Sequence, residues 1–172
     1  MSGVLEQAPV LDRPEAARDG AAFRRVAGSW ATGVAVITTV DPGGRPFGLT
    51  MSAVSSLSLE PQQFLICVDR RAESLRALEQ SRLFCINLLA RGQQDLSRRF
   101  AGKHADKFLG VPHRRLASGL PVLDGVIGFV ACRVAAMLPG GDHVIAIGDV
   151  LHAEAHGGEP LVHFRGEYRE LA

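Results

Sequence analysis

The chain has 172 residues, of which 47% are hydrophobic and 22% charged, with a formal net charge of +1. This length fits one domain with a core of its own. The balanced charge predicts no binding to nucleic acid or to anionic membranes. The three cysteines, Cys67, Cys85 and Cys132, stand far apart in apolar surroundings. We therefore expect them to be small buried residues rather than parts of a disulfide framework or a zinc site.

The N-terminal region lacks the basic and apolar segments of a secretory signal. The longest apolar stretch, 125–137, is too short to cross a bilayer and contains Arg133. We therefore expect a cytoplasmic protein without membrane contacts. Residues 1–13 are expected to form a flexible arm, and residues 14–172 a single domain.

Local patterns predict a helix first and then mostly strands. Apolar residues recur at helical spacing from Pro14 to Trp30. A β-rich segment over 34–40, a DPGGR turn over 41–45 and an extended segment over 46–59 predict a hairpin. The later predicted elements are strands over 64–69, 83–89, 126–138, 143–156 and 160–171, and short helices over 73–81 and 93–102.

These six or seven predicted strands have mostly hairpin-like connections, such as the PGGD turn over 139–142. Such connections are too short for repeated parallel crossovers. The sequence also lacks the glycine-rich loops of doubly wound nucleotide-binding folds. The fold class that fits is mainly β, with a closed or nearly closed antiparallel barrel and short flanking helices.

The densest polar signal is a row of hydroxyl side chains in strand context, namely Thr50, Ser52, Ser55, Ser56 and Ser58. Small hydroxyls and nearby backbone N–H groups suit a polar planar ring or a phosphate. Alternation along a strand with one solvent-facing side explains part of the same pattern. Both interpretations remain open from these residues alone.

Isolated residues give weaker signals. Gly33 precedes a strand, where a glycine allows close approach of a ligand to the backbone or simply ends the preceding segment. Asn87 interrupts a buried apolar run, so its amide needs a partner from the backbone or from a ligand. His143 begins a strand directly after a tight turn, and Tyr168 is the only tyrosine. No histidine stands at a recognisable metal-ligand spacing, so we expect no metal site.

In this order the segments resemble a known family. They are FRRVAGSWATGVAVITT, GLTMSAVSSLSLEP, LICVD, FCINLL, FAGKHADKF, GDHVIAIGDV and PLVHFRGEYREL, and they run from about Phe23 to Leu171. Together they resemble the flavin reductase-like family, the reductase components of two-component flavin-dependent monooxygenases.

The resemblance implies a Greek-key-like, FMN-binding split β-barrel that forms a homodimer. It implies an NAD(P)H-dependent flavin reductase that transfers hydride from NADH or NADPH to FAD or FMN and supplies free reduced flavin to an oxygenase. It assigns His143 and Tyr168 to the nicotinamide cofactor and no residue to acid–base catalysis. The flavin-binding residues that it implies are Thr32, Gly33, Val34, Thr50, Met51, Ser52, Ser55, Ser56, Asn87, Leu88, Lys107 and Phe108.

In this interpretation the chemistry belongs to the cofactors, and the protein supplies orientation and electrostatics. Two alternatives remain. One is an enzyme of the pyridoxamine-phosphate-oxidase type, which has a related fold. The other is a non-catalytic flavin- or haem-binding split-barrel module.

Overall fold

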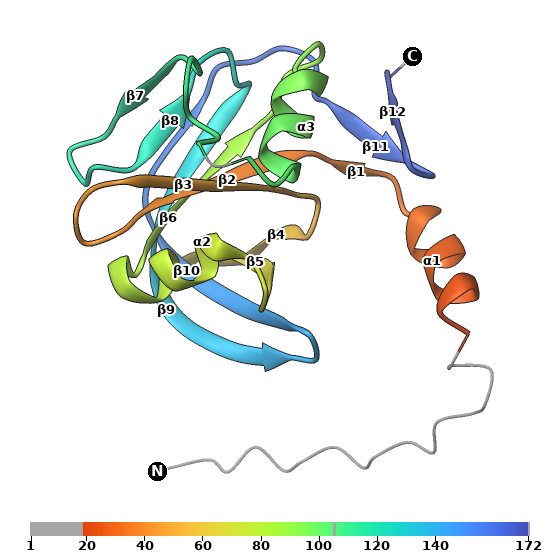
Figure 1. Ribbon diagram of the computed structural model, residues 1–172, viewed down its shortest axis with the longest axis horizontal. Helices are drawn as coiled ribbons and strands as arrows, with labels where there is room; N and C mark the ends of the chain where they lie inside the picture. The colour runs from red at the N-terminus through yellow and green to blue at the C-terminus, as the bar shows by residue number, and fades with distance from the viewer. Residues whose placement is uncertain (1–18, 105, 172) are drawn as a thin grey trace.

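The computed structural model describes residues 19–104 and 106–171, which form a mainly β fold with three short helices (Figure 1). The helices are α1 (Gly20–Gly28), α2 (Glu73–Ser81) and α3 (Gln94–Ala101). The strands are β1 (Thr32–Gly33), β2 (Ala35–Val40), β3 (Pro46–Met51), β4 (Val54–Leu59), β5 (Gln62–Asp69), β6 (Leu83–Leu88), β7 (His113–Arg115), β8 (Pro121–Leu123), β9 (Gly128–Gly140), β10 (His143–Ala155), β11 (Val162–Phe164) and β12 (Glu167–Arg169).

Seven strands form the main sheet in the order β3-β2-β6-β9-β10-β5-β4. Two small sheets, β1-β11-β12 and β7-β8, complete the strands of the described residues. Each of these strand pairings is antiparallel, which confirms the predicted class of sheet.

The main sheet curls, because its two edge strands follow each other in the chain. Only Ser52 and Ala53 separate the end of β3 from the start of β4. Consecutive Cα atoms lie about 3.8 Å apart, so Met51 and Val54 stand within about 11 Å of each other. A flat sheet of seven strands would hold its edges much farther apart, at about 4.8 Å per strand.

The core lies on both faces of the central strands. All six residues of β2 are buried, which explains why this segment has no alternation of polar and apolar residues. One apolar cluster includes Leu75 and Leu78 of α2, and another includes Phe100 of α3 with Phe108. In Figure 1, α2 and α3 lie on opposite sides of the β2–β3 hairpin, and both helices contact these two strands.

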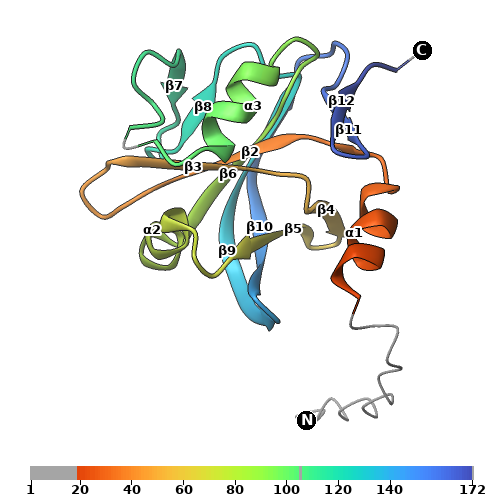
Figure 2. The ribbon, with the colours of Figure 1, turned by 45° about the vertical axis from the view of Figure 1, so that its right-hand side comes forward.

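The first helix stands apart from this core. The Asp19 carboxylate accepts a hydrogen bond from the N–H of Ala21 at 2.8 Å and caps α1. No residue of α1 is buried, and the helix lies at one side of the β fold in Figures 1 and 2. The described residues thus place a helix inside the predicted range 14–30. The start of that range, like the predicted arm over 1–13, lies outside the described residues.

Several predicted elements are confirmed, and others need correction. The helices over 73–81 and 93–102 and the hairpin of β2 and β3 are confirmed. The extended segment over 46–59 divides into β3 and β4. The predicted final strand over 160–171 divides into β11 and β12, because Arg165 and Gly166 form a turn with positive φ angles of 52° and 81°. Strands β1, β7 and β8, with two or three residues each, were not predicted.

Two of the three cysteines are buried as predicted. Burial raises the pKa of Cys85 and of Cys132 to about 12, so both remain thiols at neutral pH. The prediction is wrong for Cys67, which is only half-buried. All three are free thiols. Within the described residues, no helix has the length and hydropathy needed to span a membrane.

Candidate functional site

A cleft of about 1110 Å³ opens between β3, the start of α2, the end of α3 and the loop after α3. It is lined by Asp69 and by residues 45–50, 71–74, 100–104 and 106–110. Of the flavin-binding residues implied by the resemblance, Thr50, Lys107 and Phe108 line this cleft. Residues that are far apart in sequence are therefore brought together at one place.

Close packing of β3 against α3 forms one wall of the cleft. A Cβ atom at Gly48 would lie 2.5 Å from Cε1 of Phe100, so only glycine allows the helix to approach the strand this closely. Phe100 in turn packs edge-to-face against Phe108, with ring centroids 5.0 Å apart. The hydroxyl of Thr50 donates a hydrogen bond of 2.6 Å to the carbonyl of Ser97.

Lys107 places an ammonium group in this wall. Its Nζ donates to the carbonyls of Phe100 at 2.7 Å and of Gly48 at 3.3 Å. An ammonium has three donors, so these two contacts leave one for another acceptor. Burial lowers the pKa of Lys107, and the charge of Glu73 raises it. In the described part of the chain no carboxylate forms an ion pair with Lys107, so this partly buried cation lacks a direct counter-charge.

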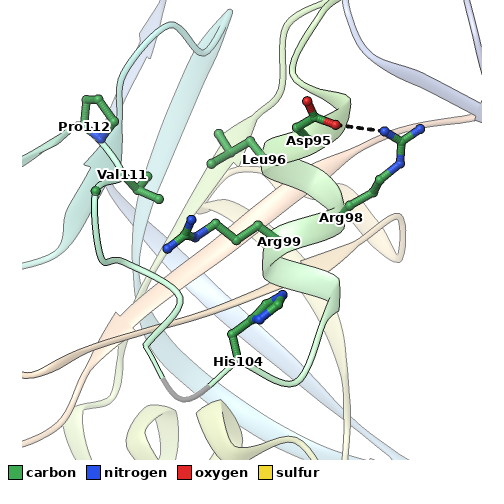
Figure 3. Close-up of a pocket in the computed structure, with 8 residues that line it drawn as sticks. Asp95, Leu96, Arg98, Arg99, His104, Val111 and Pro112 are labelled. Atoms are coloured by element: carbon green, nitrogen blue, oxygen red, sulfur yellow. Dashed lines mark hydrogen bonds and ion pairs between the residues drawn. The ribbon is translucent and has the colours of Figure 1, made fainter.

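Arg99 fixes the loop that carries Lys107. Its guanidinium donates to the carbonyls of Lys107, at 2.7 Å, and of Leu109. Figure 3 shows Arg99 extending from α3 across a smaller hollow of about 480 Å³, while Arg98 pairs with Asp95 at 2.9 Å. The sequence pattern does not single out Arg99 or Ser97. The available signal for Ser97 was its position three residues before Phe100, which places both residues on one face of the predicted helix.

The segments around Gly33 and Ser52 meet where β3 ends. Ala35 pairs with Met51, so the residues just before β2 lie near those just after β3. Val34 is buried, and its N–H donates to the carbonyl of Leu161 at 3.1 Å. Gly33 is exposed, and a Cβ atom there would meet nothing within 4 Å.

The hydroxyl side chains between Thr50 and Ser58 do not share one environment. Ser52, Ser55 and Ser56 are exposed, and Ser55 donates to the carbonyl of Ser56 at 2.9 Å. Thr50 instead points to Ser97 within the protein. These serines face solvent in this chain, but without strict alternation, because the neighbouring Ser55 and Ser56 are both exposed. Their contact with a flavin remains a prediction. The same holds for Thr32 and Met51, which are half-buried.

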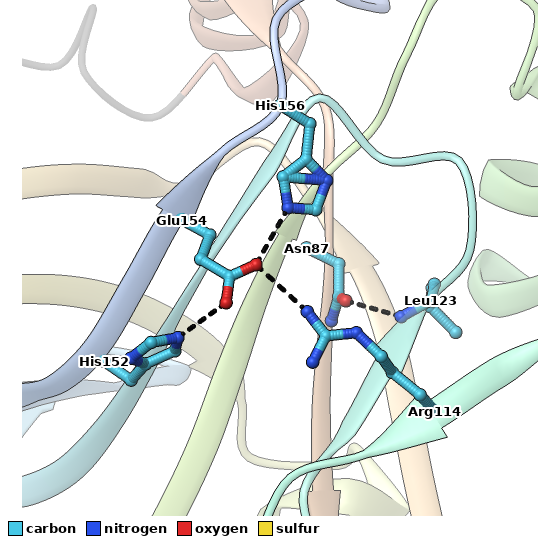
Figure 4. Close-up of polar contacts among 6 residues, drawn as sticks. All are labelled: Asn87, Arg114, Leu123, His152, Glu154 and His156. Atoms are coloured by element: carbon cyan, nitrogen blue, oxygen red, sulfur yellow. Dashed lines mark hydrogen bonds and ion pairs between the residues drawn. The ribbon is translucent and has the colours of Figure 1, made fainter.

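Asn87 has its partners inside the protein. Its side chain is fully buried, and Nδ2 donates to the carbonyl of Val36 at 3.1 Å and to Oγ1 of Thr38 at 3.2 Å. Its Oδ1 accepts from the N–H of Leu123 at 2.9 Å (Figure 4). The amide of Asn87 therefore has hydrogen-bond partners within the protein and does not need a ligand to satisfy it. The neighbouring Leu88 is half-buried at the end of β6.

The two residues implied for the nicotinamide cofactor lie apart within the chain. His143 starts β10 at the β9–β10 turn, and its Nδ1 lies 2.7 Å from Oδ1 of Asp142. Across the strand it pairs with Asp69 of the cleft. Tyr168 lies on β12, away from that turn in Figures 1 and 2, and donates to Oγ of Ser97 at 2.9 Å.

A separate polar cluster lies outside the cleft. The carboxylate of Glu154 contacts His152 at 2.8 Å, Arg114 at 3.1 Å and His156 at 3.2 Å (Figure 4). None of these residues lines the cleft. Among the described residues no group of three or more His, Cys, Asp or Glu side chains is arranged to hold a metal ion.

Comparison with known proteins gives this geometry its context. Residues 27–172 match the family described as "Flavin reductase like domain". The chain is 38% identical to "Flavin reductase (NADH)" of Kitasatospora aureofaciens over 162 residues, which cover 92% of this chain and 85% of that protein. It is also 38% identical to "Flavin-dependent monooxygenase, reductase subunit HsaB" of Mycobacterium tuberculosis over 153 residues, covering 87% and 81% of the two chains.

A solved structure gives the same result. The fold is similar to "NADH:FAD oxidoreductase SgcE6 in complex with NAD and FAD fragments" of Streptomyces globisporus, with a TM-score of 0.85 and 32% identity. The match covers 90% of this chain and 93% of that one. The family match spans nearly the whole chain, and the protein belongs to the flavin reductase like domain family.

Proposed function

We propose that this protein is an NAD(P)H-dependent flavin reductase that reduces FAD or FMN and supplies reduced flavin to a partner monooxygenase. Family membership and the names of the relatives support this proposal. The observation that carries it is Lys107, a partly buried cation without an ion-pair partner among the described residues, set in the wall of a large cleft. A flavin phosphate would supply an anionic partner for this ammonium.

The described residues fit such a cofactor. Lys107 has one donor left for a phosphate oxygen, and Arg45 and Lys103 line the same cleft. Gly33 faces open space near the end of β3, which leaves room for a planar ring beside the backbone. We infer that the ring lies by Gly33 and Ser52, and that the phosphate end lies in the cleft near Lys107.

Flavin and nicotinamide, when bound, would supply the hydride chemistry, and the protein's task is to hold the two rings together. Thr50 connects the proposed ring site to the proposed phosphate site. Its hydroxyl donates to Ser97 beside the cleft, and its backbone continues to Ser52 beside the ring. Backbone N–H groups near Thr50 and Ser52 would stabilise negative charge on the ring. No side chain is required as an acid or base for hydride transfer itself.

We further propose that residues 14–172 form one split-barrel domain. The curl of the main sheet supports this, because the edge strands β3 and β4 are joined by Ser52 and Ala53 alone. A cytoplasmic location is proposed with it, supported by three free thiols.

A homodimer is part of the same proposal. Phe23, Val26 and Trp30 follow one helical face of α1 and its end, and Trp30 is 78% exposed. Such a row of large apolar side chains favours burial against another molecule. A second copy would also cover the exposed backbone at Gly33 and exclude water from the ring. Light scattering is expected to give twice the chain mass for the wild type, and a monomer for Trp30→Glu; a monomeric wild type would refute the dimer.

The test of the function is anaerobic mixing of the purified protein with FAD or FMN and with NADH or NADPH. Loss of the visible absorbance of the oxidised flavin, at a rate proportional to protein concentration, supports the reductase. Flavin binding without bleaching would point to the non-catalytic module. Turnover of pyridoxamine phosphate in a separate assay with FMN and O₂, without bleaching by nicotinamides, would point to the other enzyme class.

A further inference from the structure

Ser97 of α3 is held from two sides by residues of different sheets. Its Oγ accepts a hydrogen bond of 2.9 Å from the hydroxyl of Tyr168 on β12. Its carbonyl accepts a hydrogen bond of 2.6 Å from the hydroxyl of Thr50 on β3. Ser97 is only 1% exposed, so these contacts form within the protein. The C-terminal hairpin and the end of β3 are thus connected through one residue.

The ring of Tyr168 has fixed neighbours as well. The guanidinium of Arg98 lies over it at 5.4 Å from the centroid, and the ring of His163 meets it at 5.8 Å with an interplanar angle of 67°. His163 pairs with Thr32 across β11 and β1. Tyr168 is therefore connected to Thr32 through the contact of its ring with His163, and to Thr50 through the hydrogen bond of its hydroxyl to Ser97.

We propose that Tyr168 is a positioning residue for the flavin, acting through Ser97 on Thr50, rather than a contact of the nicotinamide cofactor. This inference rests on the proposed reductase function. Its physical basis is that the Tyr168 hydroxyl already donates its proton within the protein. Its partner Ser97 lies one helical turn before Phe100, which packs against β3 at Gly48. Loss of the bond frees α3 to shift relative to β3, and both Thr50 and the cleft wall shift with it.

The direct test is Tyr168→Phe, which removes the hydroxyl and keeps the ring contacts with Arg98 and His163. Loss of one positioning hydrogen bond is expected to raise the KM and the Kd for flavin about threefold to tenfold. The KM for NADH and the kcat at saturating flavin are expected to stay within about twofold of the wild type. Glu167→Gln, on the same strand with an exposed side chain, serves as the control and is expected to change neither KM.

A double-mutant cycle with Thr50→Val tests the connection itself. If both hydroxyls act through Ser97, the double variant loses little more flavin affinity than the more affected single variant. Equilibrium flavin binding provides this readout without any turnover. If the rise in the flavin Kd of the double variant equals the product of the rises in the two single variants, the two hydroxyls act independently and the connection through Ser97 is refuted.

Two other results would overturn the proposal. A raised KM for NADH with unchanged flavin binding would make Tyr168 a nicotinamide contact. A lowered Tm with both KM values unchanged would make the hydroxyl purely structural. Absence of flavin reduction by the wild type would instead refute the proposed function, and the binding cycle would still report on Tyr168, Ser97 and Thr50.

Discussion

Replacement of Lys107 by methionine tests the proposed phosphate site most directly. Methionine keeps the unbranched apolar stem of lysine and removes only the ammonium. The lost group now donates to the carbonyls of Phe100 and Gly48 at 2.7 and 3.3 Å. Both acceptor residues line the cleft but are themselves buried, so the variant leaves their carbonyls without this donor. We therefore expect a loss of stability of about 1–3 kcal/mol.

The effect of this variant on flavin binding is expected to depend on the phosphate. A hydrogen bond from a charged donor contributes about 1.5–3 kcal/mol, and partial exposure of Lys107 places it near the lower end. A contribution of about 1.5 kcal/mol corresponds to a rise of about tenfold in the Kd for FMN. Riboflavin, which has the same ring and no phosphate, is expected to bind Lys107→Met as well as it binds the wild type.

The assay is quenching of flavin fluorescence on titration with wild-type protein and with Lys107→Met. An equal loss of affinity for FMN and riboflavin would refute the assignment, because it would show that the variant disturbs the site as a whole. An unchanged Kd for FMN would place the phosphate elsewhere.

The pH dependence of FMN binding follows from the same group. Burial lowers the pKa of Lys107, so its ammonium deprotonates below the usual lysine range. The affinity of the wild type for FMN is expected to fall as the pH rises through that pKa, since the cation is lost. The affinity of Lys107→Met is expected to lack this fall, and this variant also controls for titration of the flavin itself.

Three further predictions concern single residues. Gly48→Ala is expected to lower stability by about 1–3 kcal/mol, since its Cβ would lie 2.5 Å from Phe100. Gly33→Ala is the matched control: its Tm is expected to equal that of the wild type, while its flavin affinity falls. Equal Tm shifts in the two variants would contradict the prediction for Gly48. Asn87→Leu is expected to lower the free energy of unfolding, measured by chemical denaturation, by about 2–4 kcal/mol, because it leaves buried polar partners unpaired. A variant of normal stability that lost only flavin affinity would instead show that Asn87 contacts the flavin. His143→Ala is expected to raise the KM for NADH several-fold, about the value of one hydrogen bond, with little effect on flavin affinity; normal NADH kinetics would make His143 structural.

The sequence alone determined the elements whose pattern is local. The helix over 73–81 and the hairpin of β2 and β3 are readable because apolar spacing and turn residues act over a few neighbouring positions. Strands of two or three residues, such as β1 and β8, are too short to show a period, and only their partners make them strands. The order of segments along the chain was also sufficient to indicate the family, because it depends on the sequence as a whole.

Tertiary structure decided which polar groups remain available to a ligand. Asn87 and Thr50 both resembled ligand contacts in sequence, yet Asn87 bonds entirely within the core and Thr50 bonds to Ser97. The resemblance already assigned Lys107 to the flavin, but only the fold showed that it lies in a cleft wall without an ion-pair partner among the described residues. Hydrogen bonding and charge pairing are satisfied by contacts between distant segments, so no window of sequence can show which donors, acceptors and charges the fold leaves for a ligand.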